Sequence, residues 1–236
     1  MKVTNWISAY AKGFLALFYP NLCLACKEKS LHGDDILCIQ CQYQLPKTDF
    51  HLHKENEFTN RLWGRLDLFA GAALYRFTKK GKVQRLIHQL KYKGKIEVGI
   101  KLGVLYGLSL KQSELFHDVE CIVPVPLHSK KLHKRGFNQS ALFAQGLAQS
   151  MEIPWYADGL KRLVYTETQT KKNRAERLEN VLNVFEVYQP ERMEGKHILL
   201  VDDVITTGAT LEACGVKLLE IPNVKLSMAT LVFAGQ

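Results

Sequence analysis

The stretch from His197 to Thr210 constrains the fold of this chain more than any other. A continuous apolar run, Ile198-Leu199-Leu200-Val201, precedes two adjacent acids, Asp202 and Asp203, and a loop of small and hydroxyl-bearing residues. Continuous apolar runs are typical of strands covered on both faces, and ligands of open α/β sheets lie at the carboxyl ends of such strands. The stretch therefore predicts a buried parallel strand, a ligand-binding loop and then a helix.

The residue types after this strand suit a phosphorylated sugar. Asp202 and Asp203 can accept hydrogen bonds from vicinal ribose hydroxyls, while Thr206 to Thr210 offer hydroxyl and backbone N–H groups to a phosphate at a helix N-terminus. The loop lacks the lysine of a Walker A motif and the glycine spacing of a dinucleotide fold, which favours a single phosphate attached to a ribose. The alternative is a threonine-capped helix after a buried strand, with incidental aspartates.

Apolar periodicity elsewhere predicts strands that alternate with helices, and hence a largely parallel sheet flanked by helices. Strands are expected at 72–77, 121–125, 197–201 and 225–233, and helices at 83–92, 96–110, 139–150 and 210–220.

Two CxxC pairs near the N-terminus predict a small metal module. Cys23, Cys26, Cys38 and Cys41 have the spacing of a tetrahedral thiolate site, in which zinc closes a loop too poor in apolar residues to fold alone. The alternatives are free thiols or a redox CxxC pair. The expected organisation is an amphipathic helix (1–19), the four-cysteine zinc module (20–46), a polar linker (47–70) and the α/β domain (71–236).

Charge and hydropathy narrow the partners. The net charge of +9 favours an anionic partner, which can be nucleic acid, a phosphorylated small molecule or an acidic protein surface. No segment approaches the ~20 apolar residues of a membrane helix, so we expect no membrane association. Four of the six cysteines follow a metal-binding pattern rather than a disulfide framework, which favours the cytoplasm.

Taken together, these motifs resemble the ComF family of competence-associated proteins over nearly the whole of 20–233. The stretch 197–210 looks like the motif with which type I phosphoribosyltransferases bind phosphoribosyl pyrophosphate (PRPP). Further matching segments are Leu90-Lys91-Tyr92-Lys93-Gly94, Val123-Pro124-Val125-Pro126-Leu127-His128, Arg135-Gly136-Phe137-Asn138-Gln139, Gln169, Arg174, Arg177, Asn180 and Phe185.

The resemblance implies a type I phosphoribosyltransferase-like fold that binds PRPP with Mg²⁺. It implies that Asp202 and Asp203 meet the ribose hydroxyls, and that Arg174 and Arg177 lie on a mobile hood over the ligand. The candidate PRPP-binding residues are Val204, Ile205, Thr206, Thr207, Gly208, Ala209, Thr210, Pro126, Leu127 and His128. The segment Pro126-Leu127-His128 is similar to the pyrophosphate loop of amidophosphoribosyltransferases, but Leu127-His128 replace the acidic and hydroxyl residues found there. Lys131, Lys134 and Arg135 supply charge for the diphosphate or for a nucleic-acid backbone.

Three functions follow as hypotheses. The first is a PRPP-binding protein that handles incoming single-stranded DNA in the cytoplasm, with a competence helicase as the partner that the resemblance suggests. The second is an active phosphoribosyltransferase that uses an acceptor the sequence does not name. The third is a zinc-stabilised scaffold that binds DNA or protein and has lost its phosphoribosyl site.

Overall fold

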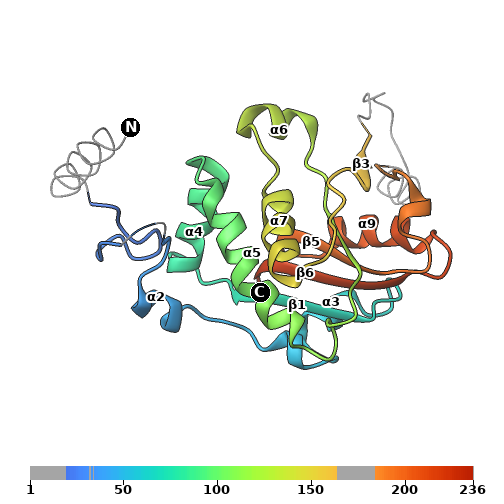
Figure 1. The fold of residues 1–236 in the computed structure, drawn as a ribbon, viewed down its shortest axis with the longest axis horizontal. Helices are drawn as coiled ribbons and strands as arrows, with labels where there is room; N and C mark the ends of the chain where they lie inside the picture. The colour runs from blue at the N-terminus through green and yellow to red at the C-terminus, as the bar shows by residue number, and fades with distance from the viewer. Residues whose placement is uncertain (1–19, 32, 34, 164–183, 236) are drawn as a thin grey trace, which may run out of the picture.

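A four-stranded parallel sheet forms the centre of the computed structural model, which describes residues 20–31, 33, 35–163 and 184–235 (Figure 1). Its strands are β1 (Ala70–Arg76), β2 (Cys121–Pro124), β5 (His197–Ile205) and β6 (Lys225–Phe233), in the order β1-β6-β5-β2. The predicted parallel sheet is confirmed. The helix expected at 1–19 lies outside the described residues.

Helices connect these strands and cover the sheet. They are α4 (Lys82–Tyr92), α5 (Ile96–Lys111), α7 (Gln139–Met151) and α9 (Ala209–Leu219), and Figure 1 shows α4, α5 and α7 side by side, with α7 nearest to the strands. The backbones of α5 and α7 approach so closely that a Cβ on Gly146 would lie 2.0 Å from the Ile100 carbonyl oxygen. A glycine at that position is therefore a packing requirement.

The strand that carries the acidic pair is longer than the sequence predicts. The apolar run predicts a strand that ends at Val201, but β5 continues to Ile205 because Val204 and Ile205 pair with Val232 and Phe233 of β6. Asp202 and Asp203 consequently lie within the C-terminal half of a central strand. The sheet, rather than a loop, fixes their backbone.

The polar stretch predicted as a linker is folded against the sheet. It contains a 3₁₀ turn, η1 (Phe50–Leu52), and the helix α3 (Glu57–Leu62). A capping box between the N-cap residue Asn56 and Thr59 stabilises the start of α3. Phe58 and Leu62, four positions apart on α3, are fully buried. This helical spacing of two apolar side chains brings the segment onto the domain.

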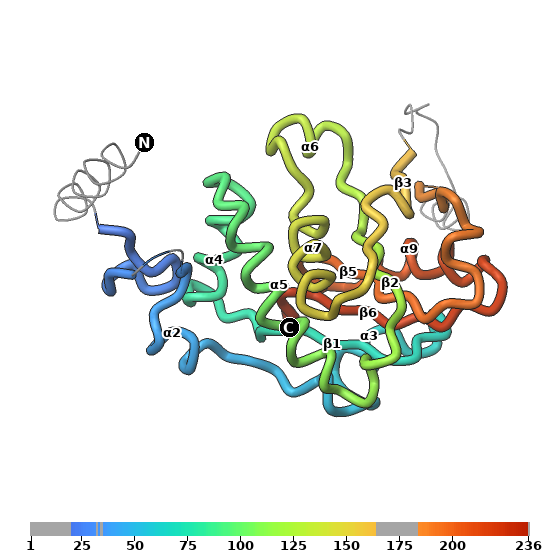
Figure 2. Tube along the Cα trace, in the orientation of Figure 1, coloured from blue at the N-terminus to red at the C-terminus, as the bar shows by residue number. Residues whose placement is uncertain are grey.

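Short elements complete the described chain. They are α2 (Ile39–Gln44) in the cysteine module, α6 (Ser129–Arg135), the antiparallel pair β3 (Leu160–Arg162) and β4 (Phe185–Val187), and the 3₁₀ turn η2 (Pro190–Arg192). Figure 2 shows α6 standing away from the body of the domain at the end of two extended segments. None of the helices in the described part of the chain has both the length and the apolar character needed to cross a bilayer.

Candidate functional site

The loop after β5 forms a small hollow at the start of α9. Gly208 caps this helix in the left-handed region, with φ of +83°, where a residue with a Cβ is strained. Asp202 and the residues Val204 to Leu211 line a hollow of about 40 Å³. Thr206, Thr207 and Thr210 line this hollow and are exposed, and Thr207 Oγ1 accepts from the Ala209 N–H at 3.4 Å.

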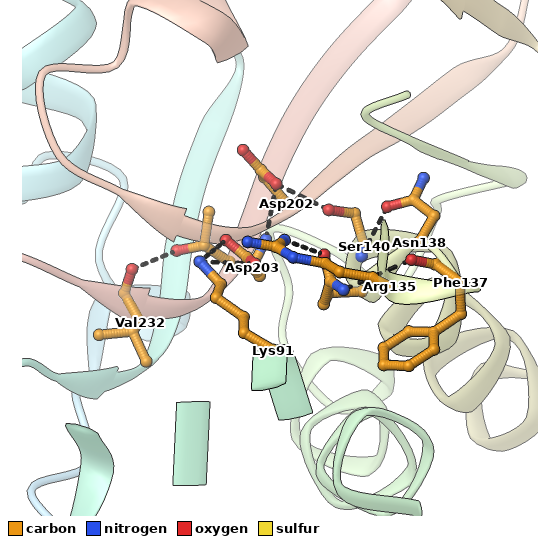
Figure 3. A network of polar contacts seen from close by, with 10 residues as sticks. Lys91, Arg135, Phe137, Asn138, Ser140, Asp202, Asp203 and Val232 are labelled. Atoms are coloured by element: carbon orange, nitrogen blue, oxygen red, sulfur yellow. Dashed lines mark hydrogen bonds and ion pairs between the residues drawn. The ribbon is translucent and has the colours of Figure 1, made fainter. Parts of the chain in front are cut away.

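The acidic pair is held by a network from three separate elements (Figure 3). Ser140 Oγ, on α7, donates to Asp202 Oδ1 at 2.7 Å, and the Asp203 backbone N–H donates to the same oxygen at 2.8 Å. The Lys91 ammonium, at the end of α4, lies 2.8 Å from Asp203 Oδ2 and 3.0 Å from Oδ1. Each carboxylate therefore has a fixed orientation, and Asp203 has a cation as its partner.

The surroundings of Asp202 disfavour its charged form. Burial, together with the neighbouring negative charge of Asp203, raises the pKa of Asp202 to about 7, against the opposing hydrogen bonds from Ser140 and the Asp203 N–H. Adjacent carboxylates in a low-dielectric site cannot both ionise freely. Near neutral pH, the pair therefore carries less than two full negative charges until a cation or donor compensates them.

Two arginines, Arg61 and Arg65, hold the loop after β5 through hydrogen bonds to its carbonyl groups. Arg61 Nη1 donates to the Thr206 carbonyl and, at 2.7 Å, to that of Ala234, while Arg65 Nη1 donates to the Thr207 carbonyl at 3.0 Å. Arg65 also forms an ion pair with Glu212 in the first turn of α9. The carbonyl groups of Thr206 and Thr207 are therefore bound by arginine side chains from outside the loop.

Arg65→Met should therefore loosen the loop without unfolding the domain. We expect the amides of 206–210 to exchange with deuterium about tenfold faster, because a hydrogen bond from a charged donor contributes roughly 1.5–3 kcal/mol and part of this is lost to solvent screening. Hydrogen–deuterium exchange with mass spectrometry measures this directly.

Arg76→Met is the matched control, because Arg76 forms a bidentate pair with Glu57 and does not contact the loop. Equal loop exchange in the Arg65 and Arg76 variants would show that Arg65 does not hold the loop.

The Pro126-Leu127-His128 segment follows β2 and leads into α6. Asn138 ties it to α7, since its Nδ2 donates to the Val125 carbonyl at 3.0 Å while its Oδ1 caps α7. His128 Nδ1 accepts from the Lys130 N–H at 3.1 Å and caps α6. In the described residues, His128 thus has a capping role at the end of this segment.

The three basic residues predicted to meet a diphosphate or a nucleic-acid backbone lie on one helix. Lys131, Lys134 and Arg135 lie on α6, which has no buried residue and ends at Gly136 with φ of +77°. Together with Lys91, Tyr92, Gly94 and Phe137 they line a cavity of about 320 Å³. The structure therefore gathers these cations beside the acidic pair. Arg174 and Arg177 lie outside the described residues.

The four cysteines of the module converge. Their sulfur atoms all lie within 4.8 Å of one another, and a tetrahedral site with Zn–S bonds of about 2.3 Å requires separations of about 3.8 Å. Cys23 Sγ also accepts a hydrogen bond from the Cys38 N–H at 3.3 Å, and N–H groups of Glu28 and Lys29 help to lower the pKa of Cys26 to about 6. The donor set fits a structural zinc ion.

Several site residues were missed or undervalued from the sequence. The sequence marks Lys91 only as part of a segment that matches the family, and no sequence pattern indicates Ser140, Arg61 or Arg65. Lys91 meets Asp203 across 112 positions of sequence, and Arg61 meets Thr206 across 145. The Leu90-to-Gly94 motif was the only local sign that this helix end belongs to the site.

The fold defines a protein of the phosphoribosyltransferase class: a parallel sheet flanked by helices, whose central strand places an acidic pair and a threonine-rich loop near its carboxyl end. Consistent with this, residues 138–236 match the phosphoribosyl transferase domain family.

Known proteins with similar sequences narrow the family. The chain is 32% identical over 201 residues to the DNA utilization protein YhgH of Escherichia coli K12, covering 84% of this chain and 83% of that protein. It is also 32% identical over 205 residues to the competence protein ComFC of Bacillus subtilis, covering 80% of each. Among solved structures, glutamine PRPP amidotransferase from B. subtilis aligns at 22% identity and a TM-score of 0.39, covering 56% of this chain and 26% of that one. The chain belongs to the ComF family of competence-associated proteins.

Proposed function

We propose that this protein binds PRPP with Mg²⁺ at the acidic pair and phosphate loop, and that it acts on incoming single-stranded DNA in the cytoplasm. One observation carries the proposal: Asp202 lines the small hollow at the start of α9, Asp203 follows it on β5, and each carboxylate is fixed by a donor from another element. Such an arrangement is costly to fold unless a ligand uses it, because buried carboxylates lose hydration.

Different residues of the site would bind different groups of PRPP. Thr206 to Thr210 and the start of α9 would hold the 5′-phosphate, and the two aspartates would meet the ribose hydroxyls. Mg²⁺, when bound with PRPP, would neutralise the diphosphate. The names of the relatives, which refer to DNA utilization and competence, support the DNA part of the proposal. A helicase partner stays a prediction.

Calorimetric titration of Mg²⁺–PRPP into the zinc-loaded chain tests the proposal. We expect binding in the micromolar range and a loss of at least ~100-fold, about 2.8 kcal/mol, in the Asp202→Ala/Asp203→Ala double variant. Asp158→Asn, which changes an exposed acid away from the loop, should bind like the wild type. Absence of heat with the folded wild type would remove the proposal and favour the scaffold hypothesis.

Transfer of the phosphoribosyl group is a second candidate function, favoured by the intact acidic pair and its lysine. Release of pyrophosphate from PRPP in the presence of a nucleobase or amine would support it. Binding of PRPP without any release would leave the first function alone.

A further inference from the structure

A cavity between α4 and α6 has the lining of a nucleotide site. We call it the basic pocket; its lining includes Lys91, Tyr92, Lys131, Lys134, Arg135 and Phe137. Its volume of about 320 Å³ is at the lower end of the range for ligand pockets, which is about 300–1,000 Å³. The pocket therefore suits one nucleotide unit of a strand, with the rest of the strand outside.

The charges of the basic pocket are available to an anion. Among the described residues, neither Lys131 nor Lys134 has an acidic partner within ion-pair distance, and both side chains are exposed on α6. Arg135 donates to Gln139 Oε1 at 2.7 Å and so keeps its full positive charge. Phosphate groups are the anions that such clusters recognise in nucleic acids.

The aromatic part of the lining suits a base. Tyr92 is 62% exposed, and the Arg135 guanidinium lies 5.4 Å from its ring centroid, so one ring face is already paired with a cation and ring surface remains open to solvent. Phe137 adds a second, half-buried ring. Aromatic rings beside lysines and arginines are typical of single-stranded nucleic-acid sites, where bases stack and phosphates meet the cations.

Lys91 belongs to both the basic pocket and the acidic pair. Its side chain lines the pocket, yet its ammonium contacts both carboxylate oxygens of Asp203, at 2.8 and 3.0 Å. In this state Asp203 neutralises Lys91, and the pocket lacks one of its four cations. Any cation or hydroxyl donor that occupies the Asp203 carboxylate competes with Lys91 for the same oxygens.

We propose that Lys91 couples the two sites, so that Mg²⁺–PRPP bound at the acidic pair strengthens the binding of single-stranded DNA in the basic pocket. This rests on the proposed PRPP site. When ribose hydroxyls or Mg²⁺ engage Asp203, the Lys91 ammonium is released to the pocket side, where it neutralises one further DNA phosphate. Because coupling between binding sites is reciprocal, the DNA strand tightens PRPP binding by the same factor.

The extra cation predicts a characteristic salt dependence. For single strands, the slope of log affinity against log salt changes by about 0.7 for each phosphate neutralised. We therefore expect Mg²⁺–PRPP to steepen the slope by about 0.7 and to raise DNA affinity at low salt about fivefold, the lower end of ordinary allosteric couplings.

Fluorescence anisotropy of a labelled oligothymidylate of about twelve residues measures this on the full chain. The titration is repeated at several salt concentrations with and without PRPP, and both arms hold the same Mg²⁺ concentration. Lys91→Gln should remove the effect of PRPP on both affinity and slope. Lys93→Gln removes an exposed neighbouring lysine that does not line the pocket and should keep the effect.

Tyr92→Ala tests the pocket itself and carries little risk to the fold, because the side chain is mostly exposed. It should weaken DNA binding about tenfold and leave the calorimetric affinity for PRPP unchanged. DNA affinity in the wild type that PRPP lowers would show that the diphosphate occupies the pocket, and an affinity that PRPP leaves unchanged would show independent sites; both overturn the coupling. Absence of PRPP binding in calorimetry would instead overturn the proposed function.

Discussion

Removal of the metal from the four-cysteine cluster should unfold 20–46 while the parallel sheet stays folded. The buried aliphatic side chains that the module contributes are few: Ala25, Ile36, Leu37 and Leu45. Apolar burial of this size does not offset the conformational entropy of ordering the segment. Structural zinc contributes roughly 10–16 kcal/mol in isolated zinc-finger peptides at pH 7, so the ion dominates the stability of such a module.

Hydrogen–deuterium exchange before and after treatment with a strong chelator locates the change. The amides of Cys23, Leu24 and Lys27 donate to carbonyls within the module at 2.8–2.9 Å, and we expect them to lose protection. Amides in β5 and β6 should keep it. The Arg85 contact with the Cys26 carbonyl, at 3.2 Å, should also be lost, which exposes one side of α4.

Two variants control for general effects of cysteine replacement. Cys26→Ser should lower the metal content below the expected one ion per chain and reproduce the exchange pattern of the chelated protein. Cys214→Ala changes a buried cysteine of α9 and should keep the metal. Unchanged protection of the module after proven metal loss would contradict a stabilising role for the ion.

The parts of this protein that the sequence predicted well are those whose signal is local. The apolar run of β5, the acidic pair and the threonine loop are consecutive in the sequence. A continuous buried strand can be predicted from its own residues alone. The four-cysteine cluster can be predicted for the same reason, because each CxxC turn brings its two cysteines together. Such features need no knowledge of what packs against them.

Features that depend on distant contacts or on a few residues in a polar background were not predictable. Ser140 donates to Asp202, which lies 62 positions later in the sequence. No sequence pattern around a serine in a helix predicts such a contact. The polar composition of 51–60 obscured α3, because only Phe58 and Leu62 are buried on it. The helix α6 has no buried face, so no hydrophobic period indicates it.

Asp202→Asn should make the protein more stable at pH 8. Burial raises the pKa of Asp202 in the native state to about 7, above its ordinary value near 4 in an unfolded chain. The native state therefore binds more protons than the unfolded state between these values, and the free energy of unfolding falls as pH rises through this window. Asparagine keeps the oxygen that accepts from Ser140 and from the Asp203 N–H, but it carries no charge.

The expected gain is about 1–3 kcal/mol at pH 8, below the ~4 kcal/mol that a pKa displaced this far allows, because the two aspartates titrate together. Chemical denaturation across pH 4 to pH 8 measures it: the variant and the wild type should differ least near pH 4, diverge up to about pH 7, and keep a constant difference above the pH at which native Asp202 ionises. Asp203→Asn is the contrasting control, since it removes the partner of the Lys91 ammonium, which is only 20% exposed.

That second variant should therefore gain less stability than Asp202→Asn at pH 8, or lose some, because it leaves a half-buried cation unpaired. If Asp202→Asn were instead the less stable protein at pH 8, the ionised carboxylate would be a net stabilising group and burial would not dominate its environment. In the expected order, the Asp202 charge destabilises the native state, so a cation or hydroxyl donor that compensates this charge recovers free energy on binding. That recovered free energy would favour the proposed binding of Mg²⁺ and a phosphoribosyl group at this strand end.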